Sequence, residues 1–438
     1  MGNALLGYAI YAMPFVLIVL VYVRKNRRQH RMSLATFQES REAGLLDPAS
    51  LHPVINLNNC IGCGSCVSAC PEMPAHQVLG MVRRKATLVS PTDCIGHGAC
   101  KTACPVDAIT LVFGTARRGV DIPNVNPNFE TNIPGIFIAG ELGGMGLIRN
   151  AIEQGRQAME CIVEKLGGTR GGTLDVVIVG AGPSGIAASL AAKQHQLSFV
   201  TLEQDSLGGT VASFPRRKLV MTSPATLPLV GKMKFTETTK EVLLAFWQEV
   251  VERTHLKINF QERLESVHKD GDSFDIVTTQ NRYSARAVLL AIGRRGTPRK
   301  LGVPGEERSK VTYRLIDPEQ YKNMKVLVVG GGDSALESAL MISEQPGTTT
   351  TLSYRSQAFS RAKKKNRLKL EDAGRDGRIE ILLESHVKSI GEEYVEIEQQ
   401  GQLLRIANDA VIVSAGGILP TGFLQELGIE IATKYGTI

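Results

Sequence analysis

The segments CIGCGSCVSACP at residues 60–71 and CIGHGACKTACP at residues 94–105 share one spacing of cysteines. The first segment reads C-x2-C-x2-C-x3-C-P, and the second repeats it with His97 in the place of the second cysteine. This spacing is typical of a domain that holds two iron–sulfur clusters, in which the fourth cysteine of each segment binds the other cluster. The sequence therefore predicts two [4Fe-4S] clusters in residues 56–114.

Each predicted cluster takes ligands from both segments. The first would be held by Cys60, Cys63, Cys66 and Cys104. The second would be held by Cys70, Cys94 and Cys100, with His97 at the fourth position. Three interpretations of His97 stay open: it binds a [4Fe-4S] cluster, it stands beside a [3Fe-4S] cluster without binding it, or the site is labile.

A zinc ribbon and a disulfide framework are the alternative interpretations of these cysteines. Zinc sites rarely need the doubled C-P ending. A disulfide framework is disfavoured because the rest of the chain is nearly free of cysteine. Of the eight cysteines only Cys161 lies outside the two segments, and a buried structural thiol is its expected role.

The composition indicates a globular α/β protein of two or three domains, with 438 residues, 43% hydrophobic residues and 44 glycines. The formal net charge is +7, but five basic residues fall in one short run, Arg24, Lys25, Arg27, Arg28 and Arg31. A basic patch beside a membrane accounts for this excess better than nucleic-acid binding does, so no nucleic-acid partner is expected.

Residues 4–23 carry no charge, and a helix of that length, at about 1.5 Å per residue, spans roughly the 30 Å hydrocarbon core of a bilayer. The basic run that follows predicts a single pass through the inner (cytoplasmic) membrane, with the catalytic part facing the cytoplasm. Residues 1–25 are thus the predicted transmembrane anchor and residues 26–55 a tether. A buried soluble helix is the alternative for the apolar run.

A complete dinucleotide-binding pattern occurs further along the chain. Residues 175–179 read as a buried parallel strand, GAGPSG at residues 180–185 opens a helix, and an acid closes the next strand. The glycines permit a tight turn and a close approach of a pyrophosphate, and the acid suits a ribose hydroxyl. The candidate binding residues are Gly180, Gly182, Pro183, Ser184, Gly185 and Glu203.

A second copy of this pattern follows, with a different ending. Residues 325–329 lead into GGGDSA at residues 330–335, and the next strand, at 349–354, ends at an arginine instead of an acid. An arginine there accommodates a 2′-phosphate, so NADPH is predicted in preference to NADH. A solvated basic face is the alternative for residues 363–365. The candidate binding residues are Gly330, Gly332, Asp333, Ser334, Ala335, Arg355 and Arg361.

A third strand–turn–helix pattern precedes both copies. It reads TNIPGIFIAGELGGMGLIRNAIEQG at residues 131–155, with an apolar strand at 135–139 and a helix expected from about residue 147. Such a turn can present backbone N–H groups to an anion or to the edge of a flavin. Two further strands that end in glycine, at 287–293 and 410–416, are predicted to connect the two nucleotide domains.

Residues 115–438 resemble the low-molecular-weight thioredoxin reductase group, which includes flavin-dependent ferredoxin–NADP reductases and bacillithiol disulfide reductases. Residues 56–114 resemble a bacterial two-cluster ferredoxin. The resemblance implies FAD at GAGPSG and NADPH at GGGDSALE with YRSQAFSRAK. NIPGIFIAGE is similar to the closing FAD motif of the group, with glutamate in place of the usual aspartate. It adds Gly140, Glu141, Arg149, Asn150 and Ala151 to the candidate FAD residues.

The predicted fold class is α/β, with FAD and NADPH Rossmann-like three-layer domains, a small α+β ferredoxin domain and one N-terminal transmembrane helix. The closing FAD segment normally comes last in the group, but here it precedes the first nucleotide-binding strand, so we infer a circular permutation. A domain-swapped dimer, in which residues 115–168 complete the FAD domain of a partner, is the alternative. The predicted domains are 115–168 and 173–297 for FAD, 298–413 for NADPH, and 414–438 returning to the FAD domain.

The predicted function is that of a membrane-anchored iron–sulfur flavoprotein oxidoreductase, in which no side chain is assigned a catalytic role. It would move electrons between NADPH, FAD and two clusters, to or from a ferredoxin, a quinone or a cytochrome. The alternatives are an electron-transfer subunit of a larger membrane complex and a disulfide reductase. The intact glycine loops disfavour the first, and the lack of any cysteine after Cys161 disfavours the second. A homodimer is compatible with the sequence.

Overall fold

The computed structural model of the chain describes residues 2–42, 46, 48, 51–73, 77–94, 96–114, 119–143, 147–167, 173–222, 224–294, 296–359 and 362–436. The side chains of residues 2–12, 14, 15 and 221 lie outside this description. The chain divides into two compact units. The N-terminal unit comprises Met1–Gly119 with Tyr435–Ile438, and the large unit comprises Val120–Lys434.

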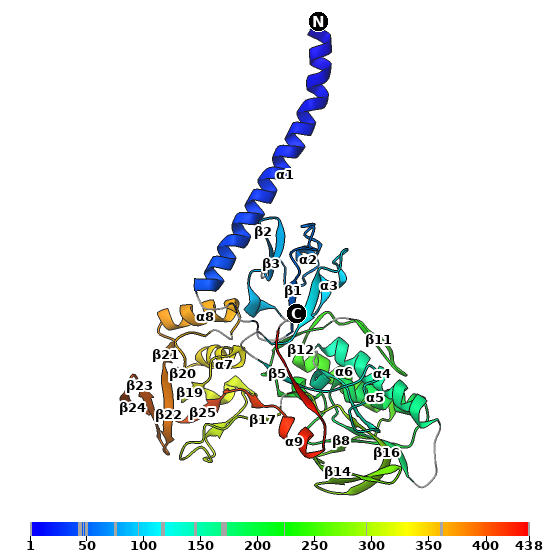
Figure 1. Cartoon of the computed structure of the whole chain (residues 1–438). Helices are drawn as coiled ribbons and strands as arrows, with labels where there is room; N and C mark the ends of the chain where they lie inside the picture. The colour runs from blue at the N-terminus through cyan, green and yellow to red at the C-terminus, as the bar shows by residue number, and fades with distance from the viewer. Residues whose placement is uncertain are drawn as a thin grey trace. The chain divides into compact units, whose positions relative to one another are not determined.

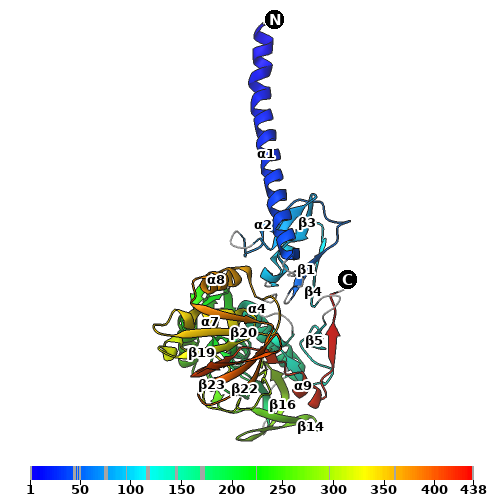
Figure 2. The ribbon, with the colours of Figure 1, turned by 90° about the vertical axis from the view of Figure 1, so that its left-hand side faces the viewer.

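The N-terminal unit consists of one long helix, α1 (Gly2–Glu42), followed by a small α+β domain (Figures 1 and 2). Two antiparallel pairs of strands build this domain, β1 (His52–Ile55) with β4 (Ile109–Val112) and β2 (Leu79–Val82) with β3 (Lys85–Leu88). Its short helices are α2 (Ser65–Ser68), η1 (Pro91–Asp93) and α3 (Ala99–Thr102). The buried core contains Cys60, Cys66, Val67, Leu79, Ala86, Cys100, Ala108 and Ile109. Cys60, Cys66, Cys70 and Cys100 are therefore buried, whereas Cys63 is exposed and Cys94 and Cys104 are half-buried.

The C-terminal half of α1 packs against β2. The Ser33 hydroxyl accepts hydrogen bonds from the Met81 N–H at 3.1 Å and from the Gln77 side-chain amide at 2.8 Å. Gly80 allows this close approach, because a Cβ on it would lie 2.5 Å from the Ser33 hydroxyl oxygen. Residues 26–42, predicted as part of a tether, are instead the docked end of a continuous helix. A single helix serine, Ser33, therefore supplies the polar contact between α1 and β2.

The predicted membrane span falls on the other half of α1. Within the residues that the structure describes, none of the helices combines the length and the apolar character needed to cross a membrane. The prediction is therefore not confirmed, and many of the side chains on which it rests lie outside the described residues. The described side chains of residues 16–23 are all exposed.

The first lobe of the large unit is a layered α/β domain. Its parallel strands are β13 (Asn259–Phe260), β8 (Phe199–Glu203), β7 (Leu174–Val179), β16 (Arg282–Leu290) and β6 (Ile136–Ile138). The strands β15 (Ser273–Thr278) and β14 (Leu264–Asp270) continue the sheet in antiparallel order. The helices α4 (Ile148–Leu166) and α5 (Pro183–Gln194) cover one face, and side chains of β14, β15 and α9 (Thr421–Glu426) cover the other. Burial on both faces explains the continuous apolar runs in these strands.

Residues 136–166 complete this lobe within the same chain. Ile136, Phe137 and Ile138 of β6 pair in parallel with residues 288–290 of β16, and α4 packs along α5. The alternative in which this segment completes a partner's domain is therefore not needed to close the fold.

Smaller elements complete the first lobe. They are β5 (Val120–Pro123), η2 (Glu141–Gly143), η3 (Gly209–Ser213), β9 (Leu219–Met221), β10 (Ala225–Leu227), β11 (Gly231–Met233), β12 (Glu237–Thr239) and α6 (Lys240–Thr254).

The second lobe repeats the architecture of the first. Its parallel strands, in spatial order, are β18 (Val311–Thr312), β25 (Ala410–Val413), β19 (Lys325–Val329), β20 (Thr349–Tyr354) and β21 (Ile379–Leu383). The helices η4 (Pro318–Tyr321), α7 (Asp333–Ser343) and α8 (Lys364–Arg375) belong to this lobe. An antiparallel sheet of β22 (Ser385–Ile390), β23 (Tyr394–Gln399) and β24 (Gln402–Ala407) packs beside it. The short pair β17 (Thr297–Pro298) and β26 (Gly417–Ile418) joins the lobes.

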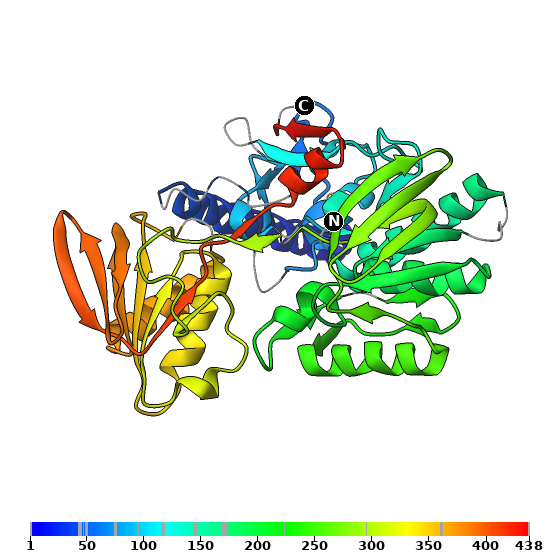
Figure 3. The same ribbon diagram turned by 90° about the horizontal axis from the view of Figure 1, so that it is seen from below.

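After the second lobe the chain returns to the first. Leu424 of α9 and Ile429 lie in the same core as Ile136 and Val177. The last strand, β27 (Ile431–Lys434), pairs antiparallel with β5, so that Lys434 lies opposite Val120 (Figure 3, red and cyan strands). The two ends of the large unit therefore meet at one end of a two-stranded ladder.

Candidate functional site

The cysteine segments line two separate cavities in the N-terminal unit. One cavity is lined by Cys60, Cys63, Cys66 and Cys104, together with apolar side chains from β1 and β4. These are the four residues that the spacing predicts for the first cluster, and the second segment contributes Cys104 as expected. The crossed arrangement of ligands follows from the fold, because β1 and β4 bring the two segments together.

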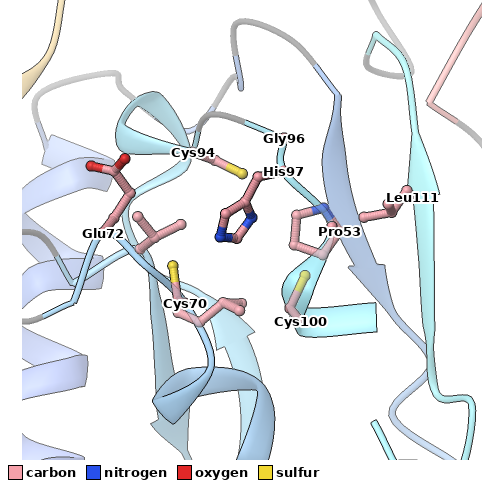
Figure 4. A pocket seen from close by; sticks show the side chains of 11 residues that line it. Pro53, Cys70, Glu72, Cys94, Gly96, His97, Cys100 and Leu111 are labelled. Atoms are coloured by element: carbon pink, nitrogen blue, oxygen red, sulfur yellow. The ribbon is translucent and has the colours of Figure 1, made fainter. Parts of the chain in front are cut away.

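The other cavity is lined by the three remaining cysteines and by His97 (Figure 4). The imidazole lies between the sulfur atoms of Cys70, Cys94 and Cys100. Its Nε2 atom is buried and has no hydrogen-bond partner, and burial lowers the pKa of His97. Glu72 also lines this cavity, and its Oε1 atom is likewise buried without a partner. Sequence reasoning missed Glu72, although it follows Cys70 and Pro71 directly.

Glycines shape both ligand loops. Gly62, Gly64, Gly96 and Gly98 have φ angles of +74°, +77°, +72° and +81°, a region that favours glycine. A Cβ on Gly62 would collide with the carbonyl oxygen of Arg84, and one on Gly96 would lie 2.6 Å from that of Leu51. The turns therefore need glycine on both sides of Cys63 and of His97, and they lead into the short helices that carry Cys66 and Cys100.

The cavities fit clusters better than a single metal ion. Among the described residues, no three histidine, cysteine or acidic side chains converge closely enough to hold one ion. Burial raises the pKa of the Cys66 and Cys94 thiols to about 11, so these thiols hold their protons at neutral pH until a metal displaces them. The donor sets, three or four sulfurs around a cavity, suit clusters of several irons.

The first glycine loop of the large unit lies at the carboxyl ends of the parallel strands. Gly180 has a φ of +109°, and a Cβ on it would lie 2.5 Å from the Ala291 carbonyl oxygen. The Glu203 carboxylate accepts hydrogen bonds from the N–H groups of Ala181 at 2.7 Å and of Asp205 at 2.8 Å. Burial raises the pKa of Glu203. Glu203, which the sequence predicts as the partner of a ribose hydroxyl, is thus hydrogen-bonded to the first glycine loop through the Ala181 N–H.

The helix after this loop, α5, begins at Pro183, and Gly182 precedes it. The Ser184 hydroxyl is buried in its first turn and has no partner. A Cβ on Gly185 would collide with the carbonyl oxygen of Gly180, which explains the third glycine of the pattern. An open helix N-terminus with an unpartnered hydroxyl fits a phosphate group of a dinucleotide.

The closing segment lies directly against this loop. A Cβ on Gly140 would lie 3.0 Å from the Ser184 Cβ, and the Gly140 N–H donates to the Gln154 side chain at 2.9 Å. Glu141 lies in η2, and the first turn of α4 contains Arg149, Asn150 and Ala151. Gln154 was missed because a glutamine inside a helix gives no sequence signal. The fold thus brings the two predicted FAD segments together.

The second glycine loop resembles the first in geometry. Gly330 has a φ of +147°, and a Cβ on it would collide with the Ser414 carbonyl oxygen, whereas a Cβ on Gly332 would meet nothing. Ser334 and Ala335 lie in the first turn of α7. The open space beside Gly332 at a helix N-terminus fits a second dinucleotide.

The remaining predicted residues of the second nucleotide site are Asp333, Arg355 and Arg361. The Asp333 carboxylate accepts hydrogen bonds at 2.8 Å from the Lys363 N–H and from the Asn366 side chain, so it anchors the start of α8. Arg355 follows β20 directly and is exposed. Arg361 lies outside the described residues. Asn366 was missed because its role depends on how α8 packs against α7.

Two Rossmann-like lobes with paired glycine loops, joined in one chain to a domain with two cysteine-lined cavities, define an iron–sulfur flavoprotein of the α/β class. The chain belongs to the pyridine nucleotide-disulphide oxidoreductase family, whose model matches residues 177–437. Residues 53–111 match the model of a 4Fe-4S dicluster domain. The protein is therefore an NAD(P)H-dependent flavin oxidoreductase that carries a 4Fe-4S dicluster domain, which confirms the resemblance predicted from the motifs. These families imply FAD and two 4Fe-4S clusters as cofactors.

Individual relatives cover the reductase part of the chain. A ferredoxin–NADP reductase from Thermus thermophilus is 30% identical over 270 residues, which are 59% of this chain and 77% of the relative. The bacilliredoxin reductase Bdr of Bacillus subtilis is 28% identical over 266 residues, or 59% of this chain and 82% of the relative. The solved bacillithiol disulfide reductase Bdr from Bacillus cereus superimposes with a TM-score of 0.53 and 27% identity, covering 59% of this chain and 82% of its own.

Proposed function

We propose that the protein oxidises NADPH and delivers the electrons one at a time, through its two cluster sites, to a ferredoxin-type redox partner. The observation that carries this proposal is the presence of two nucleotide loops and two cysteine-lined cavities in one chain. Ferredoxin–NADP reductases among the relatives support the choice of donor and partner class. A quinone or a cytochrome is the alternative partner.

FAD, when bound, supplies the exchange between a two-electron donor and one-electron acceptors. The chain's own residues would hold it in place. The start of α5 with the Ser184 hydroxyl would hold the pyrophosphate, and Glu203, which fixes the glycine loop through the Ala181 N–H, would bind the ribose. Gly140 and the first turn of α4 border the same loop.

A disulfide reductase is the second candidate, because Bdr proteins are among the relatives. Against it, the chain has no cysteine after Cys161, and residue 184 in the first glycine loop is a serine. A thiolate is the nucleophile in disulfide exchange, so the large unit has no group for that step except the half-buried Cys161 of α4.

Anaerobic mixing of the purified full chain with NADPH tests the proposed function. Flavin bleaching followed by an EPR signal from reduced clusters is the expected sequence of events. Flavin bleaching without any cluster reduction would reject electron transfer through the cluster sites, and absence of bleaching would reject NADPH as donor.

We expect NADPH to be preferred over NADH, because Arg355 directly follows β20, the position at which an arginine can accommodate a 2′-phosphate. Arg355→Glu should lower kcat/KM for NADPH by about 5- to 150-fold, corresponding to about 1–3 kcal/mol for charge-assisted hydrogen bonds, and leave NADH nearly unchanged. Arg375→Glu, at the exposed end of α8, is the matched control and should change neither value. Equal kcat/KM values for both nucleotides in the unaltered protein would contradict the expectation.

We also propose that the large unit is a circularly permuted form of the family fold. The family model matches residues 177–437, and the segment with β6 and α4 precedes it in this chain. The pairing of Lys434 with Val120 supports the proposal, since a short turn between them would restore the family order as a hairpin. A rearranged gene in which residues 120–168 follow residue 434 should therefore still give an FAD-binding protein. Loss of FAD with an intact N-terminal unit would argue against it.

Attachment to the cytoplasmic face of the inner membrane stays a proposal that rests on residues 4–23 and the basic run after them. The full chain should sediment with membranes, whereas a chain without residues 1–24 should stay in the supernatant and still bleach its flavin with NADPH. Equal distribution of both forms would refute the anchor.

A further inference from the structure

His97 occupies an unusual position in the second cavity. Its Nε2 atom is shielded from solvent and lacks any hydrogen-bond partner. A buried polar atom without a hydrogen-bond partner is costly in a native protein, so such an atom calls for an explanation, and metal binding is one.

The surroundings of this atom are those of a metal ligand. The imidazole lies between the thiols of Cys70, Cys94 and Cys100, and it comes from the same loop position that Cys63 takes in the first cavity (Figure 4). The glycines on both sides have nearly the same φ angles, +72° and +81° around His97 against +74° and +77° around Cys63. The loop therefore presents residue 97 as it presents a cysteine ligand.

Glu72 is the competing candidate, since its Oε1 atom is also buried without a partner and lines the same cavity. Figure 4 shows its carboxylate at the side of the cavity, directed away from the point between the three sulfurs, whereas the imidazole of His97 points to it. Soft iron–sulfur sites also accept imidazole, as the paired histidines of Rieske centres show.

We propose that His97 binds one iron of the second cluster through Nε2, as a neutral imidazole whose remaining proton is on Nδ1. Three thiolates and one neutral imidazole carry one negative charge fewer than four thiolates. Reduction adds one electron to the cluster without breaking a bond. A less negative set of ligands therefore stabilises the reduced state more than the oxidised state. The second cluster therefore has a higher midpoint potential than a four-cysteine cluster in the same cavity would have.

The test is a redox titration by EPR of the full chain, reduced with dithionite, so that it does not depend on NADPH or on the proposed partner. His97→Cys should keep the iron content, shift the midpoint of the second cluster to lower potential, and leave the first cluster unchanged. Pulsed EPR of the unaltered protein should show a strongly coupled nitrogen that changes on ¹⁵N-histidine labelling and disappears in His97→Cys.

Two controls keep the proposal open to refutation. Glu72→Gln should retain the histidine nitrogen coupling, because the carboxylate is not the proposed ligand, and the FAD content of each variant reports whether the large unit is intact. Absence of the histidine nitrogen coupling, or a His97→Cys protein with both midpoints unchanged, would overturn the proposal. A three-iron signal in the oxidised, freshly prepared protein that persists on adding iron would also overturn it, because residue 97 would then stand beside the cluster without binding.

Discussion

Gly155→Ala should lower the FAD content of the purified protein severely and destabilise its large unit. Gly155 lies in α4, and a Cβ there would collide with the carbonyl oxygen of Ser184 in the first turn of α5. The obstacle is backbone, so the two helices would have to separate. Overpacking of this kind costs about 1–3 kcal/mol, which exceeds the gain of up to about 1 kcal/mol in helix propensity. The shift would also move the turn that is proposed to hold the pyrophosphate.

Flavin absorbance per chain and thermal unfolding measure this effect. Gly422→Ala is the matched control, since Gly422 also lies in a helix, α9, but a Cβ there would meet nothing within 4 Å. It should leave FAD binding unchanged and alter stability by no more than about 1 kcal/mol. Full FAD content in Gly155→Ala would mean that residues 136–166 do not support the flavin site in the way their packing indicates.

Cys104→Ser should remove the first cluster, although Cys104 belongs to the second cysteine segment. Cys104 lines the cavity of Cys60, Cys63 and Cys66, and a cluster that loses one of four thiolates is expected to be lost or degraded. About half of the iron should be missing, and the EPR signal that disappears should be the one lost in Cys63→Ser. Cys70→Ser should in the same way remove the other signal.

Cys161→Ser provides the control, because Cys161 lies on α4 in the large unit and lines neither cavity, so its loss should leave the iron content unchanged. Loss of the second cluster's signal in Cys104→Ser would show that each cysteine segment holds its own cluster, against the crossed arrangement.

Much of this site could be predicted because its chemistry needs particular residues at fixed spacings. The cysteine spacing predicted which cysteines line each cavity, since the pattern itself assigns the fourth cysteine of each segment to the other site. The strand–glycine–helix patterns identified both nucleotide loops, because the collisions that a Cβ would cause at Gly180, Gly185 and Gly330 leave little choice of residue.

Other features could not be read from the chain because they depend on tertiary packing. The extension of α1 to Glu42 and its contact through Ser33 depend on the bare backbone of Gly80, which lies 47 residues further along the sequence. The role of Asp333 of α7 as the anchor of α8 depends on Asn366, which lies in α8, after the intervening strand β20. Polar residues in these places look like surface positions when only the sequence is considered.

During synthesis β5 leaves the ribosome long before β27, because the Asp121 and Thr433 side chains that hydrogen-bond across this pair are 312 positions apart. At about 5–20 residues per second, β5 would wait roughly 15–60 s for its partner strand. Over that time the edge of β5 has unpaired backbone groups of the kind that promote wrong pairing between chains. The N-terminal unit could complete most of its fold in that interval. The large unit cannot complete its fold before residue 434 has emerged, because β5 has its partner strand only then.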